Sequence, residues 1–275
     1  MMRIFFFLIA PFLLILGCSS PTERSGKPLV VVSIPPYINL IEELGDGVIE
    51  VDSVLSSTDD PHTFEPKPRQ MDSFQNARLF IGIGEPFEAG IIQALRRTSP
   101  NLQVLNLTQI TPPSGGDRHL WMSPVLVETQ VAAIATSIKT IVSGDDQGKI
   151  DTNLAELQSE LQSLDQAIQK QLRPFTSQAI LVSHPSFGYF CDQYNLVQIP
   201  VESEGKDPLP RQLEAILQLK QSKIFRCAFV VPQGAGKGTR QIAKRLEIPV
   251  YDFNPLAEDY FSNMKKLSDL IAQGS

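Results

Sequence analysis

Residues 149–173, KIDTNLAELQSELQSLDQAIQKQLR, decide the fold of this chain. Apolar residues recur in this stretch at three- and four-residue spacing, which is the period of an amphipathic helix; they are Leu154, Leu157, Leu161, Leu164, Ile168 and Leu172. Mostly polar residues fill the positions between them, and Pro174 ends the pattern. At 1.5 Å per residue such a helix spans roughly 40 Å. It is therefore long enough to run along two domains, although a coiled-coil partner helix is the alternative.

Strands and helices alternate on both sides of this helix. Strand patterns lie at residues 29–34, 49–55, 78–83 and 104–107 before it, and at residues 179–183, 196–201, 227–231 and 248–252 after it. This alternation predicts an α/β fold with two parallel-sheet (βα) domains joined by one long linker helix. The expected boundaries are 1–26 for a lipoprotein signal peptide and tether, 27–143 for the N-terminal α/β domain, 144–176 for the linker helix and 177–275 for the C-terminal α/β domain.

The N-terminus has the pattern of an export signal. A basic start at Arg3 precedes the apolar residues 4–16, a run too short for a membrane span of about 20 residues. Ile15-Leu16-Gly17-Cys18 resembles a bacterial lipobox, in which the cysteine is lipidated and becomes the mature N-terminus. We therefore expect an extracytoplasmic protein with a lipid anchor at Cys18, on the periplasmic side or at the cell surface.

Composition argues against one class of partner and leaves two states open for the cysteines. The chain has 30 acidic and 24 basic residues, a net charge of −6, and no basic run, so nucleic acid is not an expected partner. With Cys18 assigned to lipid, Cys191 and Cys227 remain. They form either a disulfide, as an oxidising compartment permits, or two buried thiols.

Three histidines are the candidate metal ligands. His62, His119 and His184 are the only histidines of the chain, and each lies in a Pro- or turn-rich junction after a strand. A single histidine is usually an ordinary polar residue, but α/β folds build their sites at strand ends, and clefts between domains favour ligands. The shared setting predicts a metal site in the interdomain cleft, and three imidazoles suit zinc better than a hard cation.

Four motifs resemble one known family. They are DPHTFEP at residues 60–66, HLW at 119–121, HPSFGYF at 184–190 and NPLAEDY at 254–260. With these motifs in this order, the whole mature chain resembles the metal-binding solute receptors of bacterial ABC importers, which deliver zinc or manganese. The resemblance implies a binding protein, not an enzyme, that acts with an ABC importer permease in the cytoplasmic membrane; we expect a monomer. It also implies that His62, His119 and His184 are metal ligands.

The same resemblance bears on the choice of metal. Manganese receptors of this family tend to carry glutamate at the third position, which is His184 here. The transported ion is therefore expected to be Zn²⁺, with a manganese-type receptor as the alternative. The histidine-rich loop of some zinc receptors is missing between Leu107 and His119.

The fourth ligand is the main departure from the family pattern. The family carries an aspartate immediately before Pro-Leu. In this chain that position is Asn254, and the nearest acid is Asp252. Residues two apart in an extended chain point to the same face, so we expect Asp252 to complete the site. The alternative is a water in the fourth position, with Asn254 as a neighbouring donor.

Two other functions are alternatives to a receptor. The stretch PQGAGKGT at residues 232–239 follows an apolar strand and resembles a phosphate loop. Its first glycine is replaced by Val231, and few residues follow it, so we expect no nucleotide binding. Three histidines also suit a zinc-dependent hydrolase with an open fourth position, but no His-Glu-x-x-His helix is present.

Overall fold

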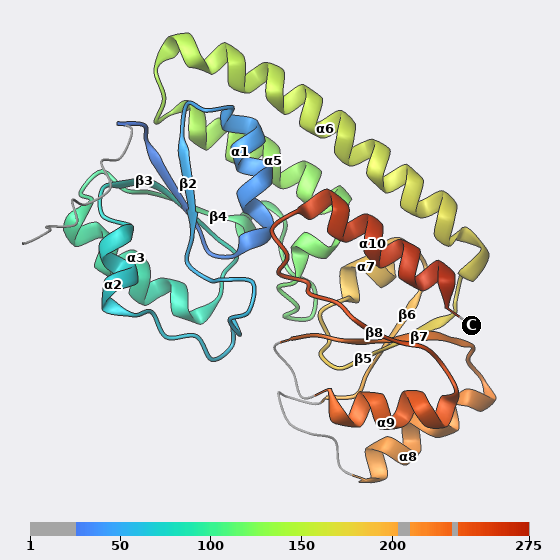
Figure 1. The fold of residues 1–275 in the computed structure, drawn as a ribbon. Coiled ribbons are helices and arrows are strands. Elements are labelled where there is room, and N and C mark those ends of the chain that lie inside the picture. The colour runs from blue at the N-terminus through green and yellow to red at the C-terminus, as the bar shows by residue number, and fades with distance from the viewer. Residues whose placement is uncertain (1–25, 203–209, 233–235, 275) are drawn as a thin grey trace, which may run out of the picture.

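Two four-stranded parallel sheets form the frame of the molecule (Figure 1). The computed structural model describes residues 26–202, 210–232 and 236–274. The first sheet has the order β2-β1-β3-β4 and contains β1 (Leu29–Val32), β2 (Glu50–Ser53), β3 (Ala77–Gly82) and β4 (Gln103–Asn106). The second has the order β6-β5-β7-β8 and contains β5 (Ala179–Val182), β6 (Val197–Pro200), β7 (Phe225–Val230) and β8 (Val250–Asp252). The two halves share one strand order, and the expected α/β class is confirmed.

Helices cover both faces of each sheet (Figure 1). The faces toward the long helix α6 carry α1 (Ile38–Gly45) and α5 (Pro124–Lys139) in the first half, and α7 (Gly188–Gln193) and α10 (Tyr260–Gln273) in the second. The opposite side carries α2 (Pro68–Ser73), α3 (Pro86–Thr98), α8 (Pro210–Gln218) and α9 (Lys237–Leu246). The remaining elements are α4 (Leu107–Ile110) and short 3₁₀ turns at Pro35–Tyr37, Leu120–Met122, Arg173–Phe175 and Leu219–Gln221.

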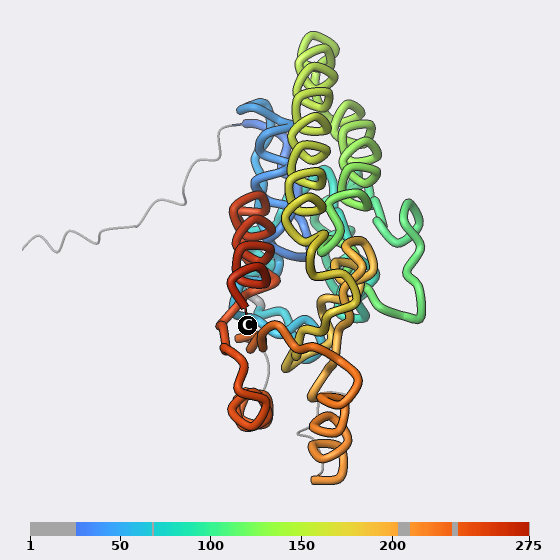
Figure 2. The backbone as a smooth tube through the Cα atoms, turned by 90° about the vertical axis from the view of Figure 1, so that its right-hand side faces the viewer, coloured from blue at the N-terminus to red at the C-terminus, as the bar shows by residue number. Residues whose placement is uncertain are grey.

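The long helix α6 runs from Gly144 to Leu172 along both halves (Figures 1 and 2). The residues of the apolar repeat face inward: four are buried (Leu157, Leu161, Ile168, Leu172), and two are partly buried against the same core (Leu154, Leu164). The helix begins before residue 149 because Asp145 and Asp146 lie in its first turn, where acids interact favourably with the helix dipole. Its apolar face packs against α1, α5 and α10, so one helix contributes to the core of both halves.

Hydrogen bonds attach both ends of α6 to its neighbours. Near its start, Asn153 Nδ2 donates to the carbonyl of Leu44 at 3.1 Å. Near its end, Gln171 Nε2 donates to Asp269 Oδ1 of α10 at 2.8 Å, and Gln171 Oε1 accepts from Ser268 Oγ at 2.9 Å. The largest hydrophobic cluster is continuous through the two halves and α6. The halves therefore share a core instead of meeting only at a linker.

Cys191 and Cys227 are free, buried thiols in the structure. Of the two states that the sequence left open, the structure has the thiols. Burial raises the pKa of Cys227 to about 12 and that of Cys191 further, so neither thiol ionises near neutral pH. Cys18 and the expected signal peptide lie outside the described residues. Among the described helices, none combines the length and apolar character needed to cross a membrane.

Candidate metal centre

His62 lies in the loop that follows β2, and a neighbouring acid shapes that loop. Asp60 Oδ1 accepts a hydrogen bond from the backbone N–H of His62 at 2.9 Å, and Asp60 Oδ2 accepts one from Thr63 Oγ1 at 3.1 Å. Such side-chain-to-backbone bonds stabilise tight turns. The turn therefore fixes the backbone from which the His62 imidazole projects.

His119 immediately precedes the 3₁₀ turn at Leu120–Met122. Asp117 Oδ1 accepts from both the backbone N–H of His119 at 2.9 Å and its Nδ1 at 2.6 Å. The ring also lies beside Trp121, with centroids 5.2 Å apart. The Trp121 indole donates to the carbonyl of Pro255 at 2.9 Å, so the His119 region is attached to the second half of the chain.

His184 comes two residues after the end of β5. The preceding residue, Ser183, is buried; its N–H donates to the carbonyl of Phe229 at 2.9 Å, and its Oγ accepts from Val231 N at 3.0 Å. These bonds tie the end of β5 to the end of β7. His184 is thus presented by the carboxyl edge of the second sheet.

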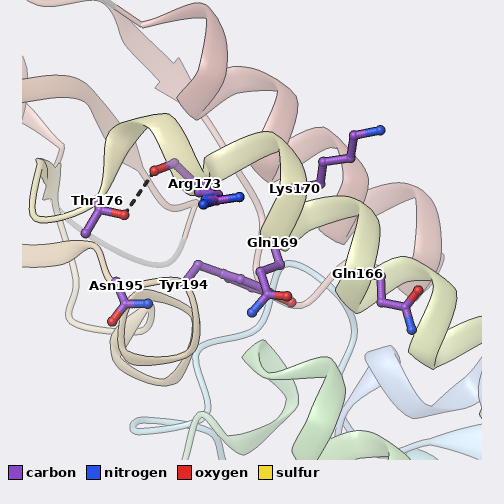
Figure 3. Close-up of a pocket in the computed structure, with 7 residues that line it drawn as sticks. All are labelled: Gln166, Gln169, Lys170, Arg173, Thr176, Tyr194 and Asn195. Atoms are coloured by element: carbon purple, nitrogen blue, oxygen red, sulfur yellow. Dashed lines mark hydrogen bonds between the residues drawn. The ribbon is translucent and has the colours of Figure 1, made fainter.

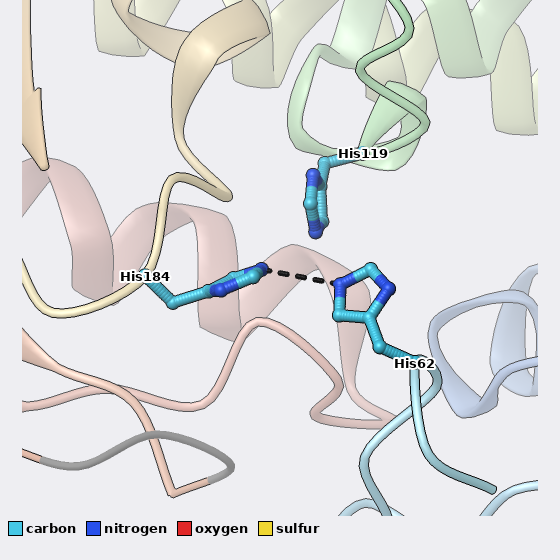
Figure 4. A group of neighbouring side chains, drawn as sticks. All are labelled: His62, His119 and His184. Carbon is cyan, nitrogen blue, oxygen red and sulfur yellow. Dashed lines mark hydrogen bonds between the residues drawn. The ribbon is translucent and has the colours of Figure 1, made fainter. Parts of the chain in front are cut away.

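The three imidazoles converge (Figure 4). One ligand atom from each of His62, His119 and His184 lies within 4.8 Å of the others, and the Nε2 atoms of His62 and His184 are 3.4 Å apart. Ring centroids are separated by 5.2 to 6.1 Å. His62 and His119 come from the first half and His184 from the second, so the site lies between the halves. Three converging imidazole nitrogens are a suitable ligand set for a zinc-sized cation.

A carboxylate lies behind each ring, on the Nδ1 side. Asp117 is 2.6 Å from His119 Nδ1, Glu202 is 3.5 Å from His184 Nδ1, and Glu85 is 3.9 Å from His62 Nδ1. Metal-binding histidines commonly give their second N–H to such groups, which fixes the tautomer and the ring orientation. These three acids were not among the site residues predicted from the sequence. The one available signal was Asp117, because it is only two residues from His119.

A buried carboxylate holds the turn that carries Glu85. Glu88 accepts from Ser33 Oγ at 2.6 Å, from Ile83 N at 2.8 Å and from Gly84 N at 3.1 Å. Burial raises its pKa, although these hydrogen bonds act in the opposite direction. Glu88 therefore links the ends of β1 and β3, close in sequence to Glu85.

The electrostatics of the site favour a neutral His184. Burial lowers its pKa to about 4, and the neighbouring rings of His119 and His62 act in the same direction because their positive charges would repel a third. Burial would raise the pKa of Asp117, but the hydrogen bonds and the charge of His119 outweigh it and hold this pKa below the usual value. A neutral imidazole beside an ionised carboxylate is the state that binds a cation.

The structure places Asp252 apart from the three imidazoles. Asp252 does not belong to the group of converging ligand atoms; its side chain is 74% exposed and forms an ion pair with Arg240 of α9. Asn254 instead connects the halves, because its Nδ2 donates to the carbonyl of Ser57 at 2.8 Å and its Oδ1 accepts from Leu256 N at 3.0 Å. The ion pair with Arg240 directs the Asp252 carboxylate, at the end of β8, toward α9.

Packing explains part of the glycine-rich stretch before α9. A Cβ on Gly236 would lie 2.3 Å from Val230 Cγ1, so a larger residue at this turn would require the Val230 side chain to move. Thr239 is fully buried, whereas a phosphate loop presents its Ser or Thr hydroxyl to a bound magnesium ion. Gly234 and Ala235 lie outside the described residues.

A separate hollow lies at the C-terminal end of α6 (Figure 3). Its volume is about 470 Å³, and it is lined by Gln166, Gln169, Lys170, Arg173, Thr176, Tyr194 and Asn195. In Figure 3 the amine of Lys170 points away from the other labelled side chains. None of the three histidines lines this hollow, so it is distinct from the metal centre.

Comparisons with known proteins agree with this arrangement. A family model described as zinc-uptake complex component A, periplasmic, matches residues 30–274. A putative metal-binding protein of Chlamydia trachomatis is 25% identical over 278 residues, which cover 98% of this chain and 99% of that protein. The high-affinity zinc uptake system protein ZnuA of Bacillus subtilis is 25% identical over 233 residues, 74% of this chain and 72% of its own. A crystal structure of ZnuA matches with a TM-score of 0.84 and 31% identity, over 90% of this chain and 99% of that one.

Proposed function

The chain belongs to the family of the periplasmic zinc-uptake complex component A, and on this premise we propose that it is an extracytoplasmic zinc receptor. It binds one Zn²⁺ and delivers it to the permease of an ABC importer. The observation that carries the proposal is the convergence of His62, His119 and His184 within 4.8 Å. One chain supplies all three imidazoles, so the site needs no second copy, and we propose that the protein acts as a monomer.

The ligand set favours zinc over manganese. Imidazole nitrogen suits zinc, whereas manganese binds preferentially to carboxylate and carbonyl oxygen. The group of converging ligand atoms is all imidazole, with the carboxylates of Asp117 and Glu202 on the far side of the rings. The fourth position of a tetrahedral zinc is then available to a water molecule or to a group of the permease during transfer.

A transport role is also favoured over hydrolysis. The matching family model describes a component of an uptake complex. A catalytic zinc with three histidines keeps one open position and activates a bound water with the help of a general base. Here the acids nearest the rings are directed at Nδ1 atoms. We propose that the zinc-loaded protein has no hydrolytic turnover.

The proposed location depends on the N-terminal residues. Residues 4–16 are apolar, and Cys18 stands in a lipobox-like setting, which supports export and lipid anchoring of the described body at a membrane surface. Substitution Cys18→Ala should abolish lipid labelling of the protein in the host cell. Retention of the lipid label in this variant would exclude Cys18 as the anchor.

Zinc titration of the purified, metal-free protein tests the proposed function. We expect one zinc per chain, tighter binding of zinc than of manganese in direct competition, and a large loss of affinity for His62→Ala, His119→Ala and His184→Ala. Glu65→Ala is the control, because Glu65 is exposed on the same loop as His62 and lies outside the ligand group. Parent-like zinc binding by any of the three histidine variants would exclude that histidine as a ligand.

A further inference from the structure

Asp117 occupies a position between His119 and the second half of the chain. Its Oδ1 accepts two hydrogen bonds from His119, one from the backbone N–H and one from Nδ1. At 2.6 Å, the bond to Nδ1 is the shortest of the three imidazole–carboxylate contacts; those of Glu202 and Glu85 are 3.5 and 3.9 Å. A proton held on Nδ1 leaves the lone pair of Nε2 available to a metal. Of the three carboxylates, Asp117 is therefore the one best placed to fix the orientation and tautomer of its imidazole ring.

Tyr189 holds the Asp117 loop from the opposite half. Tyr189 lies on α7, and its hydroxyl donates to the backbone carbonyl of Asp117 at 2.9 Å. The Tyr189 hydroxyl oxygen also accepts a hydrogen bond from the backbone N–H of Ser114 at 2.8 Å. One phenol thus satisfies two backbone groups of the loop that leads to His119.

Gly188 provides the space for this contact. A Cβ at Gly188 would lie 2.6 Å from Asp117 Oδ2, closer than van der Waals contact allows. Its backbone is helical at the first position of α7, so the requirement is close approach and not an unusual φ. Gly188 and Tyr189 together enclose the side chain and the backbone of Asp117.

We propose that Asp117 is a positioning residue that holds His119 in the Nδ1-protonated tautomer, and that Gly188 and Tyr189 of the second half hold Asp117 in place. The inference rests on the proposed zinc function. It follows that zinc affinity depends on contact between α7 and the loop at residues 114–119. Movement of this loop away from α7 releases Asp117 and weakens the site, which provides a route for metal transfer.

Zinc affinity, measured by competition with a chelator, tests the positioning role. We expect Asp117→Ala to bind zinc about 10–100-fold more weakly, which is the usual effect of losing such a partner. Asp117→Asn keeps an oxygen acceptor for Nδ1–H and should recover most of the lost affinity. Gly188→Ala and Tyr189→Phe should each weaken binding by about tenfold, the lower end of that range.

Each variant has a matched control in the same chain. Asp192→Ala removes an exposed carboxylate from the same helix as Tyr189, Tyr251→Phe removes a phenol hydroxyl from β8, and Gly90→Ala adds a Cβ to α3 where nothing lies within 4 Å. We expect parent-like zinc binding from all three. Equal losses for Asp192→Ala and Asp117→Ala would show that general negative charge, and not positioning, sets the affinity.

The tautomer of His119 gives a readout without metal. Nitrogen-15 NMR of the metal-free protein at about pH 8, where imidazole is ordinarily neutral, should place the His119 proton on Nδ1 in the parent and in Asp117→Asn. In Asp117→Ala this preference should be lost. An unchanged tautomer, or zinc affinity within twofold of the parent, in Asp117→Ala would overturn the proposal. Absence of zinc binding by the parent would overturn the proposed function instead, while the tautomer measurement would still decide the role of Asp117.

Discussion

The three imidazoles differ in how far they are removed from water. The His62 side chain is 46% exposed, whereas those of His119 and His184 are 15% and 20% exposed. His62 is thus the ring that solvent, or a transfer partner, reaches most easily. His184 is more buried than His62, and its burial affects the stability of the protein in acid.

The low pKa of His184 predicts acid sensitivity of the metal-free protein. In the unfolded chain histidine titrates near 6.5, but burial and the neighbouring rings lower this pKa to about 4 in the folded state. Between these values the unfolded state binds the proton and the folded state does not, so the free energy of unfolding falls as pH falls from 6.5 to 4. The contribution of His184 is fully retained above pH 6.5.

Urea unfolding in the presence of a chelator measures this effect. Between pH 7 and pH 4.5, we expect His184 to account for a loss of about 2 kcal/mol. His184→Asn cannot titrate, so its own loss over the same interval should be smaller by this amount. Equal losses for the parent and His184→Asn would contradict the low pKa.

Asp252→Ala tests whether the three histidines bind zinc without a carboxylate ligand. The Asp252 carboxylate is paired with Arg240 and lies outside the group of converging ligand atoms. We therefore expect the variant to bind zinc with parent-like affinity in a chelator competition. A tenfold or greater loss of zinc affinity, with unchanged thermal stability, would indicate that Asp252 is a zinc ligand.

Single residues were predictable where the chain offered few choices. His62, His119 and His184 are the only histidines; His62 and His184 lie in loops after β2 and β5, and His119 lies in the loop after α4. The position of Asp252 could not be predicted because its ion pair with Arg240 of α9 depends on packing between two elements. Glu85 and Glu202 were not identified because their approach to the rings depends on packing across strands that are distant in sequence.

At the scale of elements, α6 determines the architecture. Its inward residues contact the core of both halves, whereas residues such as Glu156 are exposed. The helix could be predicted because its apolar period is maintained from Leu154 to Leu172. The way in which α1, α5 and α10 surround it could not, since sequence periodicity identifies a buried face but not the partner that covers it.

Leu161→Ala tests the structural role of α6. Leu161 is 1% exposed, and loss of a buried leucine side chain typically costs about 2–5 kcal/mol through lost transfer energy and a residual cavity. Glu156→Ala on the exposed face is the control and should change the free energy of unfolding by less than about 0.5 kcal/mol. Similar costs for the two variants in denaturant unfolding would mean that the apolar face of α6 is not a core contact.

At the scale of the whole molecule, the shared core restrains the relative motion of the halves. The main hydrophobic cluster passes through both sheets and α6, and Trp121, Tyr189 and Asn254 add hydrogen bonds between the halves around the metal centre. Domains joined by a large apolar interface move little relative to each other. Binding and release of metal are then expected to involve the histidine-bearing loops more than a wide opening of the molecule.

The central claim is that one zinc is held between the halves by three histidines. A crystal structure of the zinc-loaded protein, with anomalous scattering recorded at the zinc edge, tests it most directly. We predict one zinc peak bonded to the Nε2 atoms of His62, His119 and His184 at about 2.0–2.1 Å, with the two halves arranged as described above. A zinc peak elsewhere in the chain, or one that lacks any of the three imidazoles, would contradict the account.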